Sequence, residues 1–153
     1  MKVCIGGTFN ILHKGHKLLI KKAFEMSGEN GFVFIGISTG NLLKKKDNVK
    51  SFEERKKTLE KYITERGYTT ELLIQPIKDK YGPSVEGDFD AIIVSPATYK
   101  VVEEINKKRK QKRKKPLEII QIPFVLAKDG IPISSTRIKN KEVDSEGSVI
   151  ERD

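Results

Sequence analysis

Two histidines close to the N-terminus, His13 and His16, are the side chains of this sequence best suited to act on a phosphate. Imidazole groups donate hydrogen bonds to phosphate oxygens, and the hydroxyl group of Thr8 can do the same. A glycine turn that opens a helix adds backbone N–H groups and the positive end of a helix dipole. This stretch therefore predicts a polyphosphate site. Its candidate ligands are Gly6, Gly7, Thr8, Phe9, His13, Gly15 and His16.

The elements on either side of this turn are expected to position the two histidines. Residues 2–5 form a short apolar run, and residues 17–24 carry apolar side chains at helical spacing. The chain is therefore predicted to run from a strand through a glycine turn into a helix. Because Gly15 separates the two imidazoles, both can face a ligand held above the glycines.

A second phosphate-binding group is predicted near the C-terminus. It consists of four adjacent polar residues: Ser134, Ser135, Thr136 and Arg137. Adjacent serines before an apolar and basic run are a good start for a helix, and their hydroxyl and N–H groups can receive a phosphate. Arg137 adds a planar guanidinium that is always charged. Alone, this stretch is typical of an ordinary helix cap, whereas together with the histidines it favours a phosphate site.

Five apolar runs alternate with segments of helical or turn character. The predicted strands are residues 2–5, 32–38, 71–77, 88–95 and 117–123. Such alternation predicts a parallel sheet with right-handed crossovers and helices on both faces. The expected fold is a Rossmann-like α/β domain. A capping-box pattern opens the helix predicted at residues 51–67, in which Arg55 is interpreted as structural.

The composition indicates one globular domain that spans residues 1–153. No apolar run approaches the roughly 20 residues of a membrane span, so a cytoplasmic protein with no membrane partner is expected. Cys4, the only cysteine, is interpreted as a core thiol, which excludes a disulfide or a thiolate metal cluster. Residues 142–153 are polar and are expected to form a flexible tail.

The net charge of +9 is concentrated in one segment. Residues 107–115 are basic except for Gln111, and they carry eight of these positive charges. Cations complement the C-terminal end of a helix, so this run is interpreted as a solvated helix end rather than a nucleic-acid site. A module that binds nucleotides or RNA without catalysis is the alternative, and it predicts RNA affinity that falls steeply with salt.

The pattern Thr8-x4-His13-x-Gly15-His16 after a first strand resembles the signature of the HxGH nucleotidyltransferase superfamily. The stretch Ser134-Ser135-Thr136 resembles its second signature. The resemblance implies that His16 and Thr8 hold the α-phosphate under attack and that His13 lies beside the nucleotide phosphates. It also implies strand order 3-2-1-4-5, with the second signature on the triphosphate. One lysine of the loop after the second strand is implied to reach phosphate, and a solvated loop is the alternative. The candidates are Lys44, Lys45 and Lys46.

Asp79-Lys80-Tyr81-Gly82-Pro83 resembles the archaeal and eukaryotic form of the phosphopantetheine adenylyltransferases, where this segment borders the acceptor pocket. The substrates implied are ATP and 4′-phosphopantetheine, with Mg²⁺ arriving on ATP and no dedicated metal site. Ser95 and Thr98 are candidate nucleotide-binding residues, and they stand where the bacterial form carries arginines that contact ATP and acceptor. The charge must then come from elsewhere, and the candidates are Lys107, Lys108 and Arg109, with Asn106 beside them.

Other acceptors remain open within the same superfamily. Nicotinamide-mononucleotide adenylyltransferases and cytidylyltransferases share the HxGH step and differ in what they modify. The sequence has neither a Walker lysine motif nor a GxGxxG motif, which argues against a P-loop enzyme and a dehydrogenase. His13 and His16 lack the further ligands that a zinc site needs.

Overall fold

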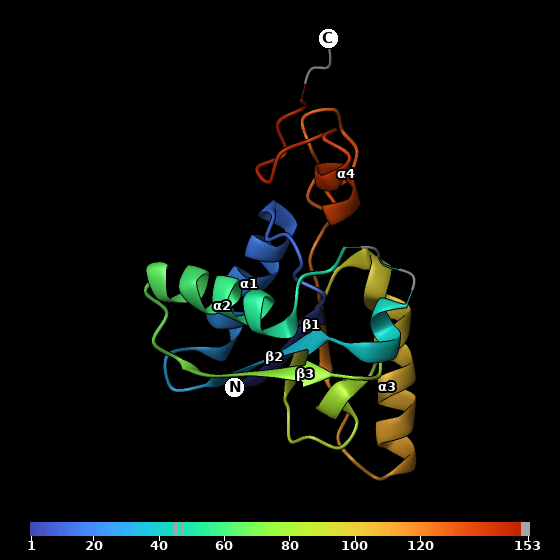
Figure 1. Ribbon diagram of the computed structural model, residues 1–153. Helices are drawn as coiled ribbons and strands as arrows, with labels where there is room; N and C mark the ends of the chain where they lie inside the picture. Colours follow the sequence, from blue (N-terminus) through green and yellow to red (C-terminus); the bar gives the residue numbers. More distant parts are fainter. Residues whose placement is uncertain (45, 47, 151–153) are drawn as a thin grey trace.

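The computed structural model describes residues 1–44, 46 and 48–150, and it contains one five-stranded parallel sheet (Figure 1). The strand order is β3-β2-β1-β4-β5, and each neighbouring pair is parallel. The expected Rossmann-like α/β fold and its strand order are confirmed. The strands are β1 (Lys2–Gly7), β2 (Phe32–Ser38), β3 (Glu71–Ile77), β4 (Ala91–Val94) and β5 (Glu118–Gln121).

Helices cover both faces of the sheet. α1 (Lys14–Ser27) and α2 (Phe52–Glu65) lie on one face, and α3 (Tyr99–Gln111) lies on the other (Figure 1). Successive residues of a strand point to opposite faces, so Val3 and Ile5 join the core beneath α1 and α2, whereas Cys4 joins the core beneath α3. The short α4 (Ser135–Lys139) lies beyond the sheet, after β5.

The winding of the chain reverses between β1 and β4, the two strands at the centre of the order. In a doubly wound sheet, such a reversal opens a crevice at the carboxyl ends of the strands. The loop after β1 contains Thr8, and the turn after β4 contains Ser95. Three short 3₁₀ turns also lie in the loops of the sheet: η1 (Gly40–Leu43), η2 (Gly82–Ser84) and η3 (Pro96–Thr98).

Arg55 on α2 ties the loops at the ends of β1 and β2 together. Its side chain is buried, and Nη1 donates to the backbone oxygens of Thr8 at 3.1 Å and Ser38 at 2.7 Å. Its Nε donates to the Lys50 oxygen at 2.8 Å. A guanidinium can satisfy several carbonyl groups at once because its donors form a fixed fork. The structural interpretation of Arg55 is confirmed.

Arg109 on α3, one of the candidates for binding substrate, is also a buried structural residue, and it is not among the described residues that line either cavity at the ends of the strands. It donates to the backbone oxygens of Ser84 and Gly87 at 2.9 Å each and of Lys115 at 2.8 Å. The side-chain amide of Asn106 is also engaged in hydrogen bonds, because it exchanges two of them with the backbone of Leu117. These two residues fasten the end of α3 to the loops around it.

The C-terminal segment is packed over the part that the structure describes, residues 142–150. Val143 is fully buried, and it bridges to Val149 in an antiparallel pair. Val143 thus anchors a mostly polar segment, for which the sequence analysis expected a flexible tail. Among the described residues, no helix is long and apolar enough to cross a membrane.

Candidate active site

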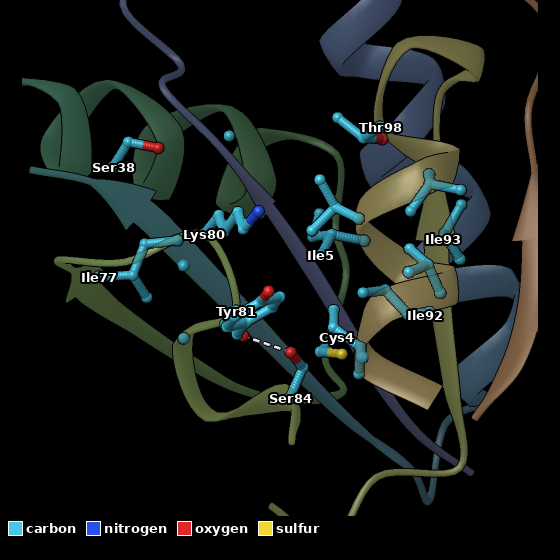
Figure 2. Close-up of a pocket in the computed structure, with 18 of the residues that line it drawn as sticks. Cys4, Ile5, Ser38, Ile77, Lys80, Tyr81, Ser84, Ile92, Ile93 and Thr98 are labelled. Atoms are coloured by element: carbon cyan, nitrogen blue, oxygen red, sulfur yellow. Dashed lines mark hydrogen bonds between the residues drawn. The ribbon is translucent and has the colours of Figure 1, made fainter. Parts of the chain in front are cut away.

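Two hollows lie at the carboxyl ends of the strands. The first, called here the apolar pocket, encloses about 300 Å³ between α3 and the sheet (Figure 2). Aliphatic and aromatic side chains form most of its wall, with Cys4 and Ile92 at the sheet and Tyr81 in the loop after β3. The second, called here the polar hollow, encloses about 900 Å³ between the start of α1 and the residues around α4.

Thr8 and Lys46 line both hollows. The Lys46 ammonium donates to the Thr8 hydroxyl at 2.5 Å, so the loop after η1 reaches across to the loop after β1. Burial lowers the pKa of Lys46 from its ordinary value, and the positive charges of Arg55 and Lys139 lower it further. An anionic ligand in either hollow would therefore stabilise the charged form of the Lys46 ammonium group.

Only one of the described lysines in the predicted group reaches this junction. Lys44 is exposed and lines neither hollow, whereas Lys46 lines both. Lys45 lies outside the described residues. Asn10, which the sequence analysis did not name, fixes the same loop, because its buried side chain accepts from Lys50 N at 2.8 Å.

His13 and His16 form a reciprocal cap at the start of α1. His13 Nδ1 accepts from Gly15 N at 3.0 Å, and His16 Nδ1 accepts from His13 N at 3.3 Å. The two rings stack with their centroids 3.8 Å apart. A Cβ on Gly15 would lie 2.9 Å from His13 Cε1, which explains why glycine stands there.

Both histidines are neutral at physiological pH. Burial lowers the pKa of His13 to about 4. Burial, followed by the charge of His13, lowers the pKa of His16 to about 3, against a smaller opposing effect of the Ile11 backbone. Because each Nδ1 accepts a backbone N–H, the neutral ring carries its proton on Nε2. Each imidazole thus offers one N–H donor, and both residues line the polar hollow.

The backbone N–H groups expected to bind phosphate are partly occupied. Gly15 N donates to His13, and Lys14 N donates to the Ser145 oxygen at 2.9 Å. In this structure the Gly15 N–H is engaged by His13, and its contact with a phosphate stays a prediction. Phe9 is buried in the core, with its ring centroid 5.0 Å from that of His16, so it supports the histidine and lines neither hollow. Gly6 and Gly7 line the apolar pocket.

The second predicted motif faces the histidines. Ser134 and Thr136 line the polar hollow together with His13 and His16. Ser134 is the N-cap of α4, and its hydroxyl accepts from Arg137 N at 3.2 Å. Ser135 begins α4, and its side chain lies outside the described part. Two motifs about 120 residues apart in the sequence thus meet at one hollow.

Arg137 is not among the described residues that line the polar hollow. It pairs with the Asp129 carboxylate and donates to the backbone oxygens of Ile131 at 3.0 Å and Pro132 at 3.2 Å. Hydrogen bonding to Arg137 lowers the pKa of Asp129 from its ordinary value. These contacts engage the guanidinium within the unliganded chain, and the contact of Arg137 with a phosphate stays a prediction. Residues three apart share a helix face, so Lys139 takes the place beside Thr136 in the hollow wall.

The sequence analysis missed several residues of the polar hollow. Lys139 lines it and donates to the Asn48 oxygen at 3.4 Å. Phe124 also lines it, although the aromatic ring follows a predicted strand without any motif around it. The basic side chain of Lys139, one turn after Thr136 in a helix already predicted, was the signal that could have revealed this residue.

Ser95 and Thr98 line the apolar pocket rather than the polar hollow. The Thr98 hydroxyl donates to the Ser95 oxygen at 3.2 Å, so both residues shape the turn after β4. Burial raises the pKa of the Cys4 thiol to about 12, and its interpretation as an unreactive core residue fits this position. Among the described residues, no group of three acidic, histidine or cysteine side chains could hold a metal ion.

The sequence is similar to those of known proteins over most of its length. Residues 4–141 match the Cytidylyltransferase-like family. Phosphopantetheine adenylyltransferase of Methanosarcina mazei is 48% identical over 147 residues, which is 95% of each chain. Phosphopantetheine adenylyltransferase of Archaeoglobus fulgidus is 38% identical over 151 residues, which is 98% of this chain and all of the relative.

Solved structures share the fold. A protein of unknown function from Archaeoglobus fulgidus superimposes with a TM-score of 0.71 at 32% identity, covering 80% of this chain and 89% of the other. Pantoate-beta-alanine ligase from Francisella tularensis shares the fold at 19% identity, with a TM-score of 0.58 over 91% of this chain and 65% of the other. The chain belongs to the Cytidylyltransferase-like family, and it is a nucleotidyltransferase.

Proposed function

We propose that this chain transfers the adenylyl group of ATP to the phosphate of 4′-phosphopantetheine, giving dephospho-coenzyme A and pyrophosphate. The observation that carries the proposal is the meeting of two unlike hollows at Thr8 and Lys46. A transfer between two phosphates needs one site for each substrate and a shared point where they react. The relatives that match nearly the whole chain bear the name of this activity.

The apolar pocket suits the pantetheine arm. The arm is long and narrow, and it combines methyl and methylene groups with two amides. The pocket offers Val102 and Ile105 from α3 for the apolar groups, and the Thr98 hydroxyl near its rim for an amide. The Tyr81 hydroxyl donates to the Glu104 carboxylate at 2.7 Å, which holds the loop after β3 against α3. The phosphate of the acceptor would then reach Thr8 and Lys46.

The polar hollow suits the nucleotide. The described side chains that line it include two imidazoles, two lysines and two hydroxyl groups besides that of Thr8, and none is a carboxylate. This lining favours a polyanion. Ser134, Thr136 and Lys139 on one side would hold the pyrophosphate that leaves, while His13 and His16 on the other face the phosphate under attack.

The chemical step needs positioning and charge stabilisation more than a base. The attacking group is already an anion, and an oxygen of the acceptor phosphate forms a bond to the α-phosphorus while the bond to the pyrophosphate oxygen breaks. His16 Nε2–H would donate to a non-bridging α-oxygen, and Lys46 would stabilise the charge between the two phosphates. Neutral imidazoles can act as donors throughout this step without releasing a proton.

Magnesium enters this reaction as part of the substrate. Mg²⁺ prefers phosphate, carboxylate and water oxygens in octahedral geometry, and the described lining of both hollows lacks carboxylates. The ion would therefore be held by the phosphate oxygens of ATP and by water, and it would neutralise part of their charge. The protein residues would contact the phosphate oxygens that the ion leaves exposed.

The choice of acceptor predicts a simple outcome. We expect release of pyrophosphate with ATP and 4′-phosphopantetheine, and at most a small fraction of that rate with nicotinamide mononucleotide, because the apolar pocket matches a pantetheine arm. A coupled pyrophosphate assay with each acceptor measures this. Turnover of nicotinamide mononucleotide alone, or no turnover together with salt-sensitive binding of RNA, would overturn the proposal.

Replacement by alanine is expected to have a large effect at Lys46 and almost none at Lys44. Lys46→Ala should lower kcat/KM by about 100-fold, the usual order for loss of one charge that stabilises a transition state. Lys44→Ala should change kcat/KM by less than about twofold, because Lys44 is exposed and lines neither hollow. Steady-state kinetics of the two variants gives the comparison. Equal losses in both would remove Lys46 from its assigned role.

The neutral state of the histidines can be observed directly, because His13 and His16 are the only histidines in the chain. Imidazole ¹⁵N shifts of the unliganded protein should report neutral rings with Nε2–H from pH 8 down to about pH 5, since burial depresses both pKa values. Below pH 6.5 the unfolded chain then binds more protons than the folded one, so the free energy of unfolding should fall as the pH drops from 6.5 toward 4. A titration of His16 centred near pH 6.5 would contradict the proposed donor.

A further inference from the structure

Residues 123–150, called here the C-terminal lobe, form a unit with its own small core. Val143 packs with Ala127 and Ile133 at its centre. Lys128 N donates to the Gly147 oxygen at 2.8 Å, which joins the two hairpin-like segments of the lobe. The same lobe carries Ser134 and Thr136 on the wall of the polar hollow. The position of the lobe therefore sets the position of that wall.

The end of the lobe, residues 142–150, called here the strap, has a defined shape. The Asp144 carboxylate accepts from Glu146 N at 3.0 Å and from Ser148 N at 2.8 Å, which closes a tight turn. Gly147 within this turn has a φ of +85°, and a Cβ there would lie 2.9 Å from Ile133 Cδ1. Glycine is thus required both for the backbone conformation and for the contact with the core of the lobe.

This turn docks on the first turn of α1. The Ser145 oxygen accepts from Lys14 N at 2.9 Å, and the Glu146 carboxylate pairs with the Lys17 ammonium at 2.6 Å. Lys14 and Lys17 each follow a histidine of the polar hollow in the sequence. In Figure 1 the red end of the chain lies next to the dark blue start of α1. The strap thus connects the wall that carries Ser134 to the helix that carries the histidines.

We propose that the strap is a positioning element that holds the C-terminal lobe over His13 and His16 and thereby sets the affinity for the nucleotide. This inference rests on the proposed function, because it takes the polar hollow as the site of MgATP. Lys14, Ser145 and Glu146 contribute no group to the lining of that hollow. They act by keeping its two sides at one separation, so that one triphosphate meets the histidines and α4 together.

Lys14 permits an unusually selective test. It is the first residue of α1, where proline is well tolerated because the N–H has no partner within the helix. The preceding residue, His13, has φ −120° and ψ 177°, the extended conformation that a following proline favours. Lys14→Pro therefore removes the hydrogen bond to Ser145 with little strain on the helix. Lys14→Ala removes the same exposed side chain and keeps the N–H, so it is the matched control.

Calorimetric titration with MgATP should show a dissociation constant about 3–10-fold higher for Lys14→Pro than for the natural chain, the usual effect of one lost hydrogen bond. Lys14→Ala should stay within about twofold. In steady-state assays the increase should appear in the KM for ATP and not in the KM for 4′-phosphopantetheine, because the apolar pocket lies away from the strap. Equal affinities for the proline and alanine variants would overturn the proposal.

A charge swap provides a second test that does not alter the backbone. Lys17→Glu and Glu146→Lys should each weaken MgATP binding by about 2–5-fold, as expected for a partly exposed ion pair. The double variant keeps the net charge of the natural chain and should recover its affinity. Glu25→Lys, which disrupts a pair on the same helix, should have little effect. Failure of the double variant to recover would refute the role of the pair.

These binding measurements separate the strap from the proposed function. If the natural chain binds MgATP but does not use 4′-phosphopantetheine, the choice of acceptor fails and the strap can still be judged from the titrations. If the natural chain turns over both substrates and the strap variants bind MgATP like their controls, the strap proposal fails alone. Hydrogen exchange should also quicken at α4 in Lys14→Pro relative to Lys14→Ala, since the lobe loses an anchor.

Discussion

The contact between Lys46 and Thr8 depends on a buried arginine that joins two strands. Arg55 donates to the backbone oxygens of Thr8 and Ser38, so the loops after β1 and β2 keep a fixed separation. Burial lowers the pKa of Lys46, and the positive charge of Arg55 lowers it further. Two cations therefore lie close together when no ligand is bound. A phosphate bound at this point, as proposed, would relieve their repulsion. Arg55 would thus couple the packing of the two strands to the affinity of the proposed site for an anion.

The two histidines also combine a structural role with a chemical one. Each Nδ1 caps a backbone N–H at the start of α1, and this fixes the ring, its tautomer and its neutral charge together. The other nitrogen of each ring carries the proton that it can donate, and the His16 ring also interacts with the Ile11 backbone. Gly15 makes the arrangement possible, because a side chain there would collide with the His13 ring. The motif therefore encodes a donor pair rather than a pair of acids.

Much of the fold could be predicted from the sequence, because buried parallel strands are nearly continuous apolar runs and their ends carry turn residues. The paired motifs around His16 and Ser134 were also predicted, since each opens a predicted helix and contains residues suited to phosphate. The direction of Arg137 could not be predicted, because it depends on Asp129 in a hairpin whose geometry the sequence does not reveal. The structural contacts of Arg109 could not be predicted for a related reason: its carbonyl partners belong to loops that are distant in the sequence.

The packing of the strap could not be predicted from its composition. Residues 142–150 are mostly polar, and one buried valine is enough to anchor them when Asp144 closes a turn. The contact of Ser145 with Lys14 joins segments that are far apart in the sequence, so no local pattern predicts it. The segment that the sequence analysis expected to be a flexible tail thus connects the two sides of the polar hollow over residues 142–150.

Amide NMR mapping of the two substrates tests the central claim, that two hollows share one junction. Titration with 4′-phosphopantetheine should shift the amides of Tyr81 and Val102, and an unreactive ATP analogue should shift those of Phe124 and Thr136. Both ligands should shift Thr8, which lines both hollows. The same set of shifted amides for both ligands, or an unchanged Thr8, would contradict the assignment of one hollow to each substrate.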